Sequence, residues 1–193
     1  MIEGLRVTGV VLAGGLGRRM GGVDKGLRPL RGRPMVQWVL ERFSPQVDEV
    51  MINANQHLDE YAAFGWPVVQ DRVAGFAGPL AGLHAALSAT SSPLVATVPC
   101  DSPFLPLDLV ERLTGALEQH GVDLAAARAG ERSHPVFCVC RHSLLARLDA
   151  FLAGGGRKVE QWHGTLAAVE VDFDDQAEAF SNINTPEELA QFE

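Results

Sequence analysis

The sequence predicts an α/β protein built around a largely parallel central sheet. Short apolar, β-branched runs end at glycine, asparagine or an acid, and they alternate along the chain with segments of helical periodicity. Proline or glycine stands at the ends of several of these helical segments. Strands that alternate with helices favour a parallel sheet, because parallel neighbours are joined by helical crossovers. No internal repeat, low-complexity tract or long linker interrupts the pattern, so we expect a single domain over residues 1–193.

The first half of the chain gives the clearest elements. Residues 7–12 form a β-branched run that ends at paired glycines, which predicts a buried strand. Residues 34–43 open with proline and repeat apolar residues at helical spacing, which predicts a helix. Two further strands are expected at 49–55 and 67–71. A helix with a glycine-proline start is expected at 78–89.

The second half continues the alternation. A strand at 93–101 again ends on an acid, and an amphipathic helix at 106–121 has proline near its start and glycine just after its end. The remaining expected elements are strands at 123–128 and 135–140, a helix around 143–153, a strand at 166–173 and a last helix at 185–192.

Composition narrows the class of protein. The 193 residues are 47% hydrophobic and 21% charged, which is ordinary for a globular protein, and no apolar run suits a signal peptide or a membrane span. Cys100, Cys138 and Cys140 show no Cys-x-x-Cys spacing, which argues against a disulfide framework or a zinc site. The net charge of −8 disfavours nonspecific binding of nucleic acid. We therefore expect a cytoplasmic protein that binds neither nucleic acid nor membrane.

The charge is unevenly distributed. Six of the 16 basic residues fall between Arg18 and Arg33, where only Asp24 opposes them, whereas residues 171–193 hold seven acids and no base. A local basic segment directly after a glycine loop indicates a small polyanionic ligand. The alternative is a solvated arginine-rich loop.

Polar residues follow several of the predicted strands. In a parallel α/β sheet the ligand binds beyond the carboxyl ends of the strands. These ends carry glycines, amides and acids, which together predict one polar site along that edge: Ala13-Gly14-Gly15, Asn53-Ala54-Asn55, Asp71 and Cys100-Asp101.

The glycine loop in "VVLAGGLGRRMGGVDKG" matches neither common phosphate-loop pattern. A P-loop requires lysine directly after glycine and then a hydroxyl residue, whereas Lys25 lies between Asp24 and Gly26. A dinucleotide fingerprint requires a helix that opens at the glycines and an acid about 20 residues further on. The segment "GRRMGGVDKGLRPLRGRP" is too rich in Gly and Pro for that helix, and the next strand ends in asparagines.

A different phosphate site fits the loop better. Glycine amides can form an anion nest, Arg18 or Arg19 can grip phosphate oxygens, and Lys25 can reach over a triphosphate as a point charge. Asp101, on a separate strand end, could hold Mg²⁺, which prefers one or two protein carboxylates together with substrate phosphates. This arrangement suits transfer of a nucleotidyl group.

These motifs resemble a known family. The segments "LAGGLGRRMGGVDKGL", "RGRPM", "INAN", "GPLAGL", "PCDSPFLP", "ERSHPV" and "NINTPEEL" appear in the order found in the molybdenum cofactor guanylyltransferases. The resemblance covers nearly the whole chain, and the combination of "PCDSPF" with "NINTPEEL" is its most specific part. Cytidylyltransferase relatives typically carry "LAAG" and sugar pyrophosphorylases are longer, whereas the "LAGG" of this chain goes with GTP in the family.

The resemblance implies a fold and an activity. The fold would be a three-layer, Rossmann-like α/β domain of the nucleotide-diphospho-sugar transferase type, with a nucleotide part at about 1–105 and an acceptor part at about 106–193. The activity would be Mg²⁺-dependent transfer of GMP from GTP to the phosphate of molybdenum-molybdopterin, with release of pyrophosphate. Catalysis would rest on Lys25 and Asp101, with Asp101 holding the metal. The residues implied to bind the nucleotide are Leu12, Ala13, Gly14, Gly15, Arg19, Lys25, Asn53, Asp71 and Asp101.

Several points remain open at this level. The resemblance places Asn182 and Asn184 near the pterin side, although asparagine before Thr-Pro-Glu-Glu also suits a helix cap. His134 touches the acceptor phosphate or is structural, and Asp71 contacts the base or the ribose. Molybdenum-insertion proteins and molybdoenzyme chaperones are the implied partners of an expected monomer. The rival functions are nucleotidyl transfer to another phosphorylated acceptor, such as a sugar phosphate, and non-catalytic nucleotide binding.

Overall fold

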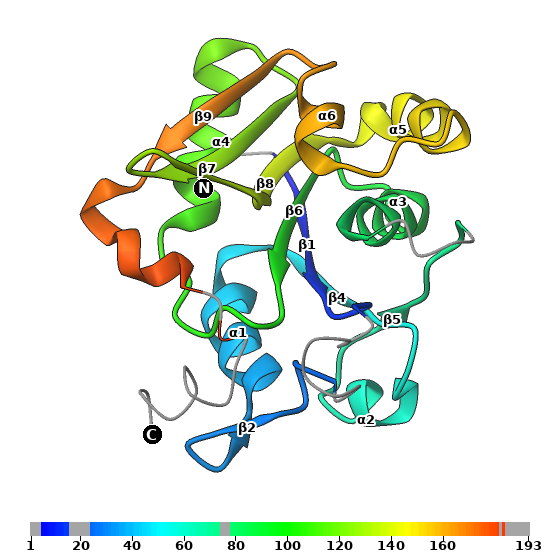
Figure 1. Ribbon diagram of the computed structural model, residues 1–193, viewed down its shortest axis with the longest axis vertical. Helices are drawn as coiled ribbons and strands as arrows, with labels where there is room; N and C mark the ends of the chain where they lie inside the picture. Colours follow the sequence, from blue (N-terminus) through cyan, green and yellow to red (C-terminus); the bar gives the residue numbers. More distant parts are fainter. Residues whose placement is uncertain (1–4, 16–23, 74–77, 182, 184–193) are drawn as a thin grey trace.

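A seven-stranded sheet forms the centre of the molecule, with strand order β5–β4–β1–β6–β8–β7–β9 (Figure 1). The computed structural model describes residues 5–15, 24–73, 78–181 and 183. All strands of this sheet run parallel except β8, so the predicted, largely parallel sheet is confirmed. The strands are β1 (Val7–Leu12), β4 (Glu49–Asn53), β5 (Val68–Val69), β6 (Leu94–Pro99), β7 (Leu124–Ala129), β8 (Arg132–Arg141) and β9 (Ala168–Asp172).

Strand β1 lies between β4 and β6, and the three strands end at the same level. Leu12 is paired with Asn53 on one side and with Pro99 on the other. Two further backbone hydrogen bonds continue past the ladder, from Ala13 N to Asn53 O at 2.8 Å and from Cys100 N to Leu12 O at 3.1 Å. The predicted alignment of polar strand ends at one edge is therefore present.

Helices cover both faces of the sheet (Figure 1). Alternate β1 side chains point to opposite faces: Val7 and Val11 pack in the cluster with α1 (Met35–Phe43) and α4 (Leu109–His120). Val10 packs on the other face with α3 (Pro79–Ala89), α5 (Leu145–Ala153) and α6 (Val159–His163). The predicted three-layer architecture is thus observed.

Helices α1 and α3 begin, and helix α4 ends, at the proline and glycine residues that predicted these ends. Pro34 precedes α1 with φ −53°, and Pro79 occupies the first position of α3. Gly121 follows α4 with φ 61°, a left-handed conformation that costs glycine little. The three helices predicted at 34–43, 78–89 and 106–121 are confirmed, with α4 starting three residues later than expected.

Four strands are shorter than expected: β6 lacks residues 93, 100 and 101 of its predicted range, β9 lacks 166, 167 and 173, and β4 and β5 are shortened as well. Strand β4 ends at Asn53 rather than residue 55, and β5 covers only Val68 and Val69 of the predicted 67–71. Beyond the last backbone pairs of β4 and β5, side-chain hydrogen bonds connect the two segments. Asn53 Nδ2 donates to Val69 O at 3.2 Å, and Asn55 bonds to the backbone and side chain of Asp71. The strand ends are thereby converted into a polar cluster.

Some smaller elements were not predicted from the sequence. A hairpin of β2 (Pro29–Leu30) and β3 (Arg33–Pro34) turns at Arg31 and Gly32, both with positive φ. Helix α2 (Leu58–Ala62), helix α6 and the 3₁₀ helices were also not predicted; the latter are η2 (Ser44–Gln46), η3 (His142–Leu144) and η4 (Asp174–Phe180). The helix predicted at 185–192 lies outside the described residues.

Strand β8 has the opposite direction because its link to β7 is short. Only Gly130, with φ 58°, and Glu131 join Ala129 to Arg132, and such a link permits an antiparallel hairpin alone. The amino end of β8 consequently lies at the edge where the other strands have their carboxyl ends. Cys138 and Cys140 of β8 are buried in the same cluster, as expected for core residues.

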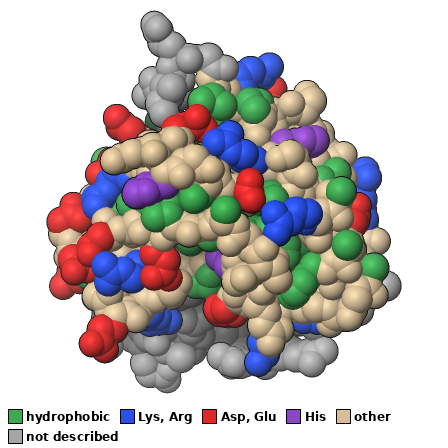
Figure 2. Space-filling model, turned by 90° about the horizontal axis from the view of Figure 1, so that it is seen from above, with side chains coloured by type: hydrophobic (Ala, Val, Ile, Leu, Met, Phe, Trp, Pro, Cys, Tyr) green, Lys and Arg blue, Asp and Glu red, His purple; other side chains and the backbone are tan. Residues whose placement is uncertain are grey.

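The amino-end edge of the sheet carries ion-paired side chains. Figure 2, which views the molecule from above, shows basic and acidic side chains interspersed on one face. Ion pairs at the amino ends of strands connect Arg6 with Glu49 and Arg147 with Asp123.

In the part of the chain that the structure describes, no helix has the length and apolar character needed to cross a membrane.

Helix α6 carries a buried pair of polar rings. Trp162 is fully buried and His163 is largely buried beside it, with the ring centroids 5.7 Å apart. Burial lowers the pKa of His163 to about 4, although Glu160 and Glu170 act in the opposite direction. This imidazole is therefore neutral in the folded protein at neutral pH.

Candidate active site

Three side chains at the ends of β4 and β5 form a connected hydrogen-bond network. The Asp71 carboxylate accepts from Asn53 Nδ2 at 2.9 Å and from Asn55 Nδ2 at 2.8 Å, one bond on each oxygen. Asn55 Oδ1 in turn accepts the backbone N–H of Asp71 at 2.9 Å. Each carboxylate oxygen retains a further lone pair, so Asp71 is held in place while remaining able to accept a bond from a ligand.

The same network reaches the glycine loop. Asn55 Nδ2 also lies 3.3 Å from Gly14 O. A Cβ on Gly14 would stand 2.7 Å from Asn55 Nδ2 and 3.0 Å from Asn53 Oδ1. Glycine is therefore needed at this position because the asparagine amides approach the backbone directly. Ala13 before it is buried, whereas Gly15 after it is exposed.

The start of α3 packs closely against this cluster. A Cβ on Gly82, in the "GPLAGL" segment, would overlap Asn53 Oδ1 and would lie 2.6 Å from Leu12 Cδ2. The structure shows close packing at Gly82, and it places α3 directly behind Asn53.

Lys25 and Asp101 meet at the end of β6. Lys25 Nζ lies 3.1 Å from Asp101 Oδ2, with side chains 26% and 11% exposed. The low exposure of the carboxylate keeps water from screening this pair fully. Two residues that are 76 positions apart in the sequence, and that were both predicted to be catalytic, are thus in direct contact.

Asp101 is also joined to the C-terminal part of the chain. The backbone N–H of Ile183 donates to Asp101 O at 2.9 Å, and the buried Ile183 side chain packs with Leu30 and Met35. Ile183, the one described residue of "NINTPEEL", therefore lies beside Asp101. Asn182 and Asn184 themselves, like Arg18 and Arg19, lie outside the described residues.

His134 lies near the amino end of β8, at this same edge. Its ring stacks on Phe180 with centroids 4.8 Å apart and planes inclined by 27°. Burial, together with the nearby charge of Arg132, lowers the pKa of His134. The structure gives His134 a packing role, and contact with an acceptor phosphate stays a prediction.

The buried cysteine next to Asp101 is no nucleophile. Burial, together with the charges of Asp101 and Asp24, raises the pKa of Cys100 well above the ordinary thiol value. The thiol is therefore protonated at neutral pH. The groups at this edge that remain suited to chemistry are amides, a cation and carboxylates, which position phosphates and balance their charge.

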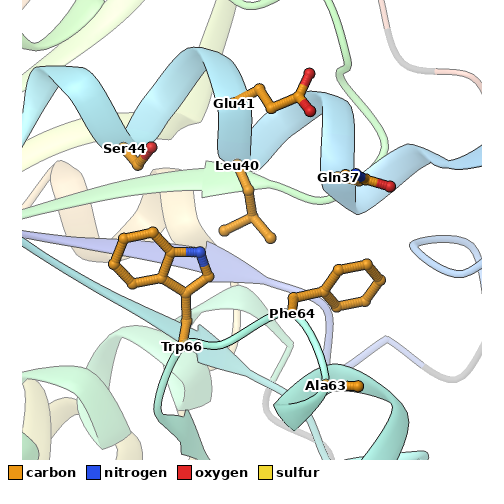
Figure 3. Close-up of a pocket in the computed structure, with 7 residues that line it drawn as sticks. All are labelled: Gln37, Leu40, Glu41, Ser44, Ala63, Phe64 and Trp66. Atoms are coloured by element: carbon orange, nitrogen blue, oxygen red, sulfur yellow. The ribbon is translucent and has the colours of Figure 1, made fainter.

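A separate hollow of about 500 Å³ lies between α1 and the segment after α2 (Figure 3). Leu40, Phe64 and Trp66 supply its apolar walls, and Gln37 and Glu41 supply polar ones. None of the predicted site residues lines it. The candidate site is therefore the carboxyl-end edge rather than this hollow.

Sequence reasoning missed the roles of two residues in or beside the site. Asn55 was placed at the polar edge but was not assigned to nucleotide binding, although it joins Gly14 to Asp71. Tyr61 was not considered, yet its hydroxyl donates to Asp24 Oδ1 at 2.5 Å, beside Lys25. A signal for Tyr61 was present, because it is the one tyrosine of the sequence and lies in a short polar segment, "HLDEYA".

Comparisons with known proteins identify the family of this chain. A family model described as the MobA-like NTP transferase domain matches residues 9–168. The molybdenum cofactor guanylyltransferases of Cupriavidus necator and Shewanella putrefaciens are 52% and 48% identical to this chain, and each alignment covers 97% of this chain and 96% of the relative. The crystal structure of molybdopterin-guanine dinucleotide biosynthesis protein A from Archaeoglobus fulgidus superposes with a TM-score of 0.80, at 27% identity over 95% of both chains. The chain therefore belongs to the MobA-like nucleotidyltransferase family that includes these molybdenum cofactor guanylyltransferases.

Proposed function

We propose that this protein transfers GMP from GTP to the phosphate of molybdenum-molybdopterin and releases pyrophosphate. The observation that carries the proposal is the contact between Lys25 and Asp101 at the carboxyl-end edge. A cation and a carboxylate in contact there suit a polyphosphate, since the cation can bind phosphate oxygens once a ligand separates the pair. The names of the relatives supply the choice of guanine nucleotide and of acceptor.

The residues present fit Mg²⁺ as the metal of the reaction. Mg²⁺ is usually held by one or two carboxylates and by substrate phosphates rather than by an all-protein cage. Asp101 provides one carboxylate at the strand end, and the described residues hold no group of three or more His, Cys, Asp or Glu side chains that could form such a cage. When bound, the metal would neutralise charge on the phosphates.

The protein's own groups would act by position and charge. The acceptor phosphate is already an anion at neutral pH, so its oxygen can attack the α-phosphorus without a general base. A new P–O bond forms at the α-phosphorus as the bond to the β-phosphate oxygen breaks, and pyrophosphate carries away the electron pair. Lys25 offsets the repulsion between the anions, and the Asn53–Asp71 cluster holds the nucleoside end.

Product analysis tests the proposal directly. The purified protein is incubated with GTP, Mg²⁺ and molybdenum-loaded molybdopterin, and the products are identified by mass spectrometry. The expected products are the guanine dinucleotide and pyrophosphate. Guanylylation of a sugar phosphate in place of molybdopterin would favour the rival acceptor, and nucleotide binding without turnover would favour a non-catalytic protein.

The two lysines of the sequence provide a matched pair of variants. Lys25→Ala should lower turnover about a hundredfold, because one charge-stabilising group at a transition state is typically worth about 3 kcal/mol. Lys158→Ala removes the other lysine, which is exposed before α6, and should leave turnover unchanged. A Lys25→Ala enzyme with turnover within twofold of the parent would contradict the role given to Lys25.

A further inference from the structure

The loop that carries Lys25 is anchored to an aromatic residue in the core. Tyr61, on α2, is fully buried, and its hydroxyl donates to Asp24 Oδ1 at 2.5 Å. The same Asp24 oxygen accepts the backbone N–H of Gly26 at 3.0 Å. The carboxylate of Asp24 therefore links both sides of Lys25 to the phenol.

Further contacts hold this turn in place. Gly26 O accepts the N–H of Val36 at 2.9 Å, and Lys25 O accepts the N–H of Arg28 at 3.2 Å. The backbone carbonyls of Lys25 and Gly26 are thus bonded to the turn itself and to α1. The Lys25 side chain is left to extend to Asp101.

Tyr61 also lies against the strand end that carries Asp101. A Cβ on Gly26 would stand 2.5 Å from the Tyr61 hydroxyl oxygen and 3.3 Å from Cys100 Sγ. Gly26 is therefore packed between the phenol and the residue next to Asp101. The tyrosine joins the turn before Lys25 to the end of β6, and its hydroxyl is the one polar atom that it offers.

The phenol keeps its proton in this environment. Burial is the main cause that raises the pKa of Tyr61 well above its ordinary value, and the nearby Cys100 and the hydrogen bond to Asp24 act in the same direction. Tyr61 is therefore the donor and Asp24 the charged acceptor. A hydrogen bond to a charged group contributes more than one between neutral groups.

We infer that Tyr61 is a positioning residue, which acts through Asp24 to hold Lys25 in register with Asp101. The inference rests on the proposed role of Lys25 and adds a residue outside the nucleotide site. Tyr61 touches neither Lys25 Nζ nor the reacting groups in this scheme. It fixes the position of the turn that carries Lys25, so that the ammonium group is already placed to contact the triphosphate when the nucleotide binds.

Tyr61→Phe is the central variant, because it keeps the ring and removes only the hydroxyl. We expect kcat to fall at least about tenfold, the loss typical of one hydrogen bond to a charged group, while KM for GTP changes less than about twofold. Asp24→Ala should have a similar effect, and the double variant should be no worse than either single one. Additive losses in Tyr61→Phe and Asp24→Ala would overturn the inference, because the two groups would then act independently.

A second measurement reads the position of Lys25 without any turnover. The sequence contains two lysines, so acetylation by an amine-reactive ester can be followed at Lys25 and at the exposed Lys158 in one mass spectrum. In Tyr61→Phe, acetylation of Lys25 should become several-fold faster, because its contact with Asp101 is loosened, while Lys158 keeps its rate. An unchanged Lys25 rate would overturn the inference.

A matched control separates positioning from general destabilisation. Phe64→Leu changes a neighbouring aromatic residue that packs on the same core but makes no bond to Asp24. It should lower the melting temperature and leave both the Lys25 acetylation rate and kcat near the parent values. A comparable rise in Lys25 acetylation in Phe64→Leu would overturn the specific role of the hydroxyl.

The two proposals can fail separately. Normal turnover in Lys25→Ala, combined with faster Lys25 acetylation in Tyr61→Phe, would refute the catalytic role of Lys25 and leave the positioning intact. Loss of turnover in Lys25→Ala, combined with parental acetylation and kcat in Tyr61→Phe, would refute the positioning alone. If Tyr61 acts through Lys25, Tyr61→Phe should cause no further loss of kcat in the Lys25→Ala background.

Discussion

Replacing Asp71 by alanine tests whether this carboxylate reads guanine. The N1–H and exocyclic amine of guanine are adjacent donors that one carboxylate can accept together, whereas adenine presents an acceptor at the corresponding ring nitrogen. With adenine, the half-buried Asp71 would face that ring-nitrogen acceptor and would keep only its bonds from Asn53 and Asn55. Asp71→Ala should therefore reduce the preference for GTP over ATP by about tenfold or more, which corresponds to about 1.4 kcal/mol.

The structure adds a stability cost to the same variant. Asp71→Ala removes two amide-to-carboxylate hydrogen bonds, at 2.9 and 2.8 Å, and leaves both asparagine amides without that acceptor. At about 1 kcal/mol or slightly more for each bond in this partly buried cluster, the free energy of unfolding should fall by about 2–3 kcal/mol. Urea unfolding measures this loss, and competition between GTP and ATP measures the change in selectivity.

Asn55→Ala is the control for this experiment. It removes one amide from the Asp71 carboxylate but keeps the carboxylate itself, so it should lower stability by about 1–2 kcal/mol and leave most of the nucleotide preference. A destabilised Asp71→Ala protein with an unchanged GTP-to-ATP ratio would refute base reading. Equal weakening of both nucleotides would place Asp71 on the ribose.

Other perturbations follow from the same contacts. Asp101→Asn should retain the melting temperature within a few degrees but lose magnesium-dependent turnover about a hundredfold, measured by steady-state kinetics; ordinary magnesium dependence would make Asp101 structural. The folded pKa of His163 of about 4 lies below its ordinary 6.5, so its share of stability is complete above pH 6.5 and is lost as the pH falls toward 4. Between pH 6.5 and pH 4, the free energy of unfolding of His163→Gln should fall by roughly 3 kcal/mol less than that of the parent, as measured by urea unfolding at several pH values. An unchanged pH dependence would refute this. Gly82→Ala should lower the free energy of unfolding by about 1–3 kcal/mol, because its Cβ would overlap Asn53. Gly115→Ala in α4 should raise it by about 0.5–1 kcal/mol, because a Cβ there meets no atom within 4 Å. Equal shifts of the melting temperature in the two variants would contradict the overlap.

The larger elements were predictable because their signals are local. The run Val7–Leu12 ends at glycines and became β1 with the predicted bounds, and the prolines before α1 and α3 marked the starts of these helices closely. The rule that parallel sheets bind ligands at carboxyl ends correctly predicts that Gly14, Asn53 and Asp71 lie together. These residues are far apart in sequence, but each lies at the carboxyl end of a strand or two residues beyond it.

The remaining features depend on contacts between distant segments. No local pattern shows that β8 inserts between β6 and β7, although the two residues between Ala129 and Arg132 are a hairpin signal in retrospect. Helix α2 has five residues and is stabilised by the burial of Tyr61 against the lysine turn rather than by its own periodicity. The predicted ends of β4 and β5 were too long because side-chain hydrogen bonds replaced the ladder there.

The bond from Ile183 N–H to Asp101 O has a consequence for how the protein matures on the ribosome. Synthesis proceeds from the N-terminus, so the glycine loop, Lys25 and Asp101 all emerge well before Ile183 does. The strands β1, β4 and β6 can pair at that stage, but Asp101 O still lacks the N–H of Ile183, and Leu30 and Met35 still lack their contact with the Ile183 side chain. A nascent chain can therefore pair these strands early, yet the contacts of Asp101 are completed only when Ile183 has been synthesised.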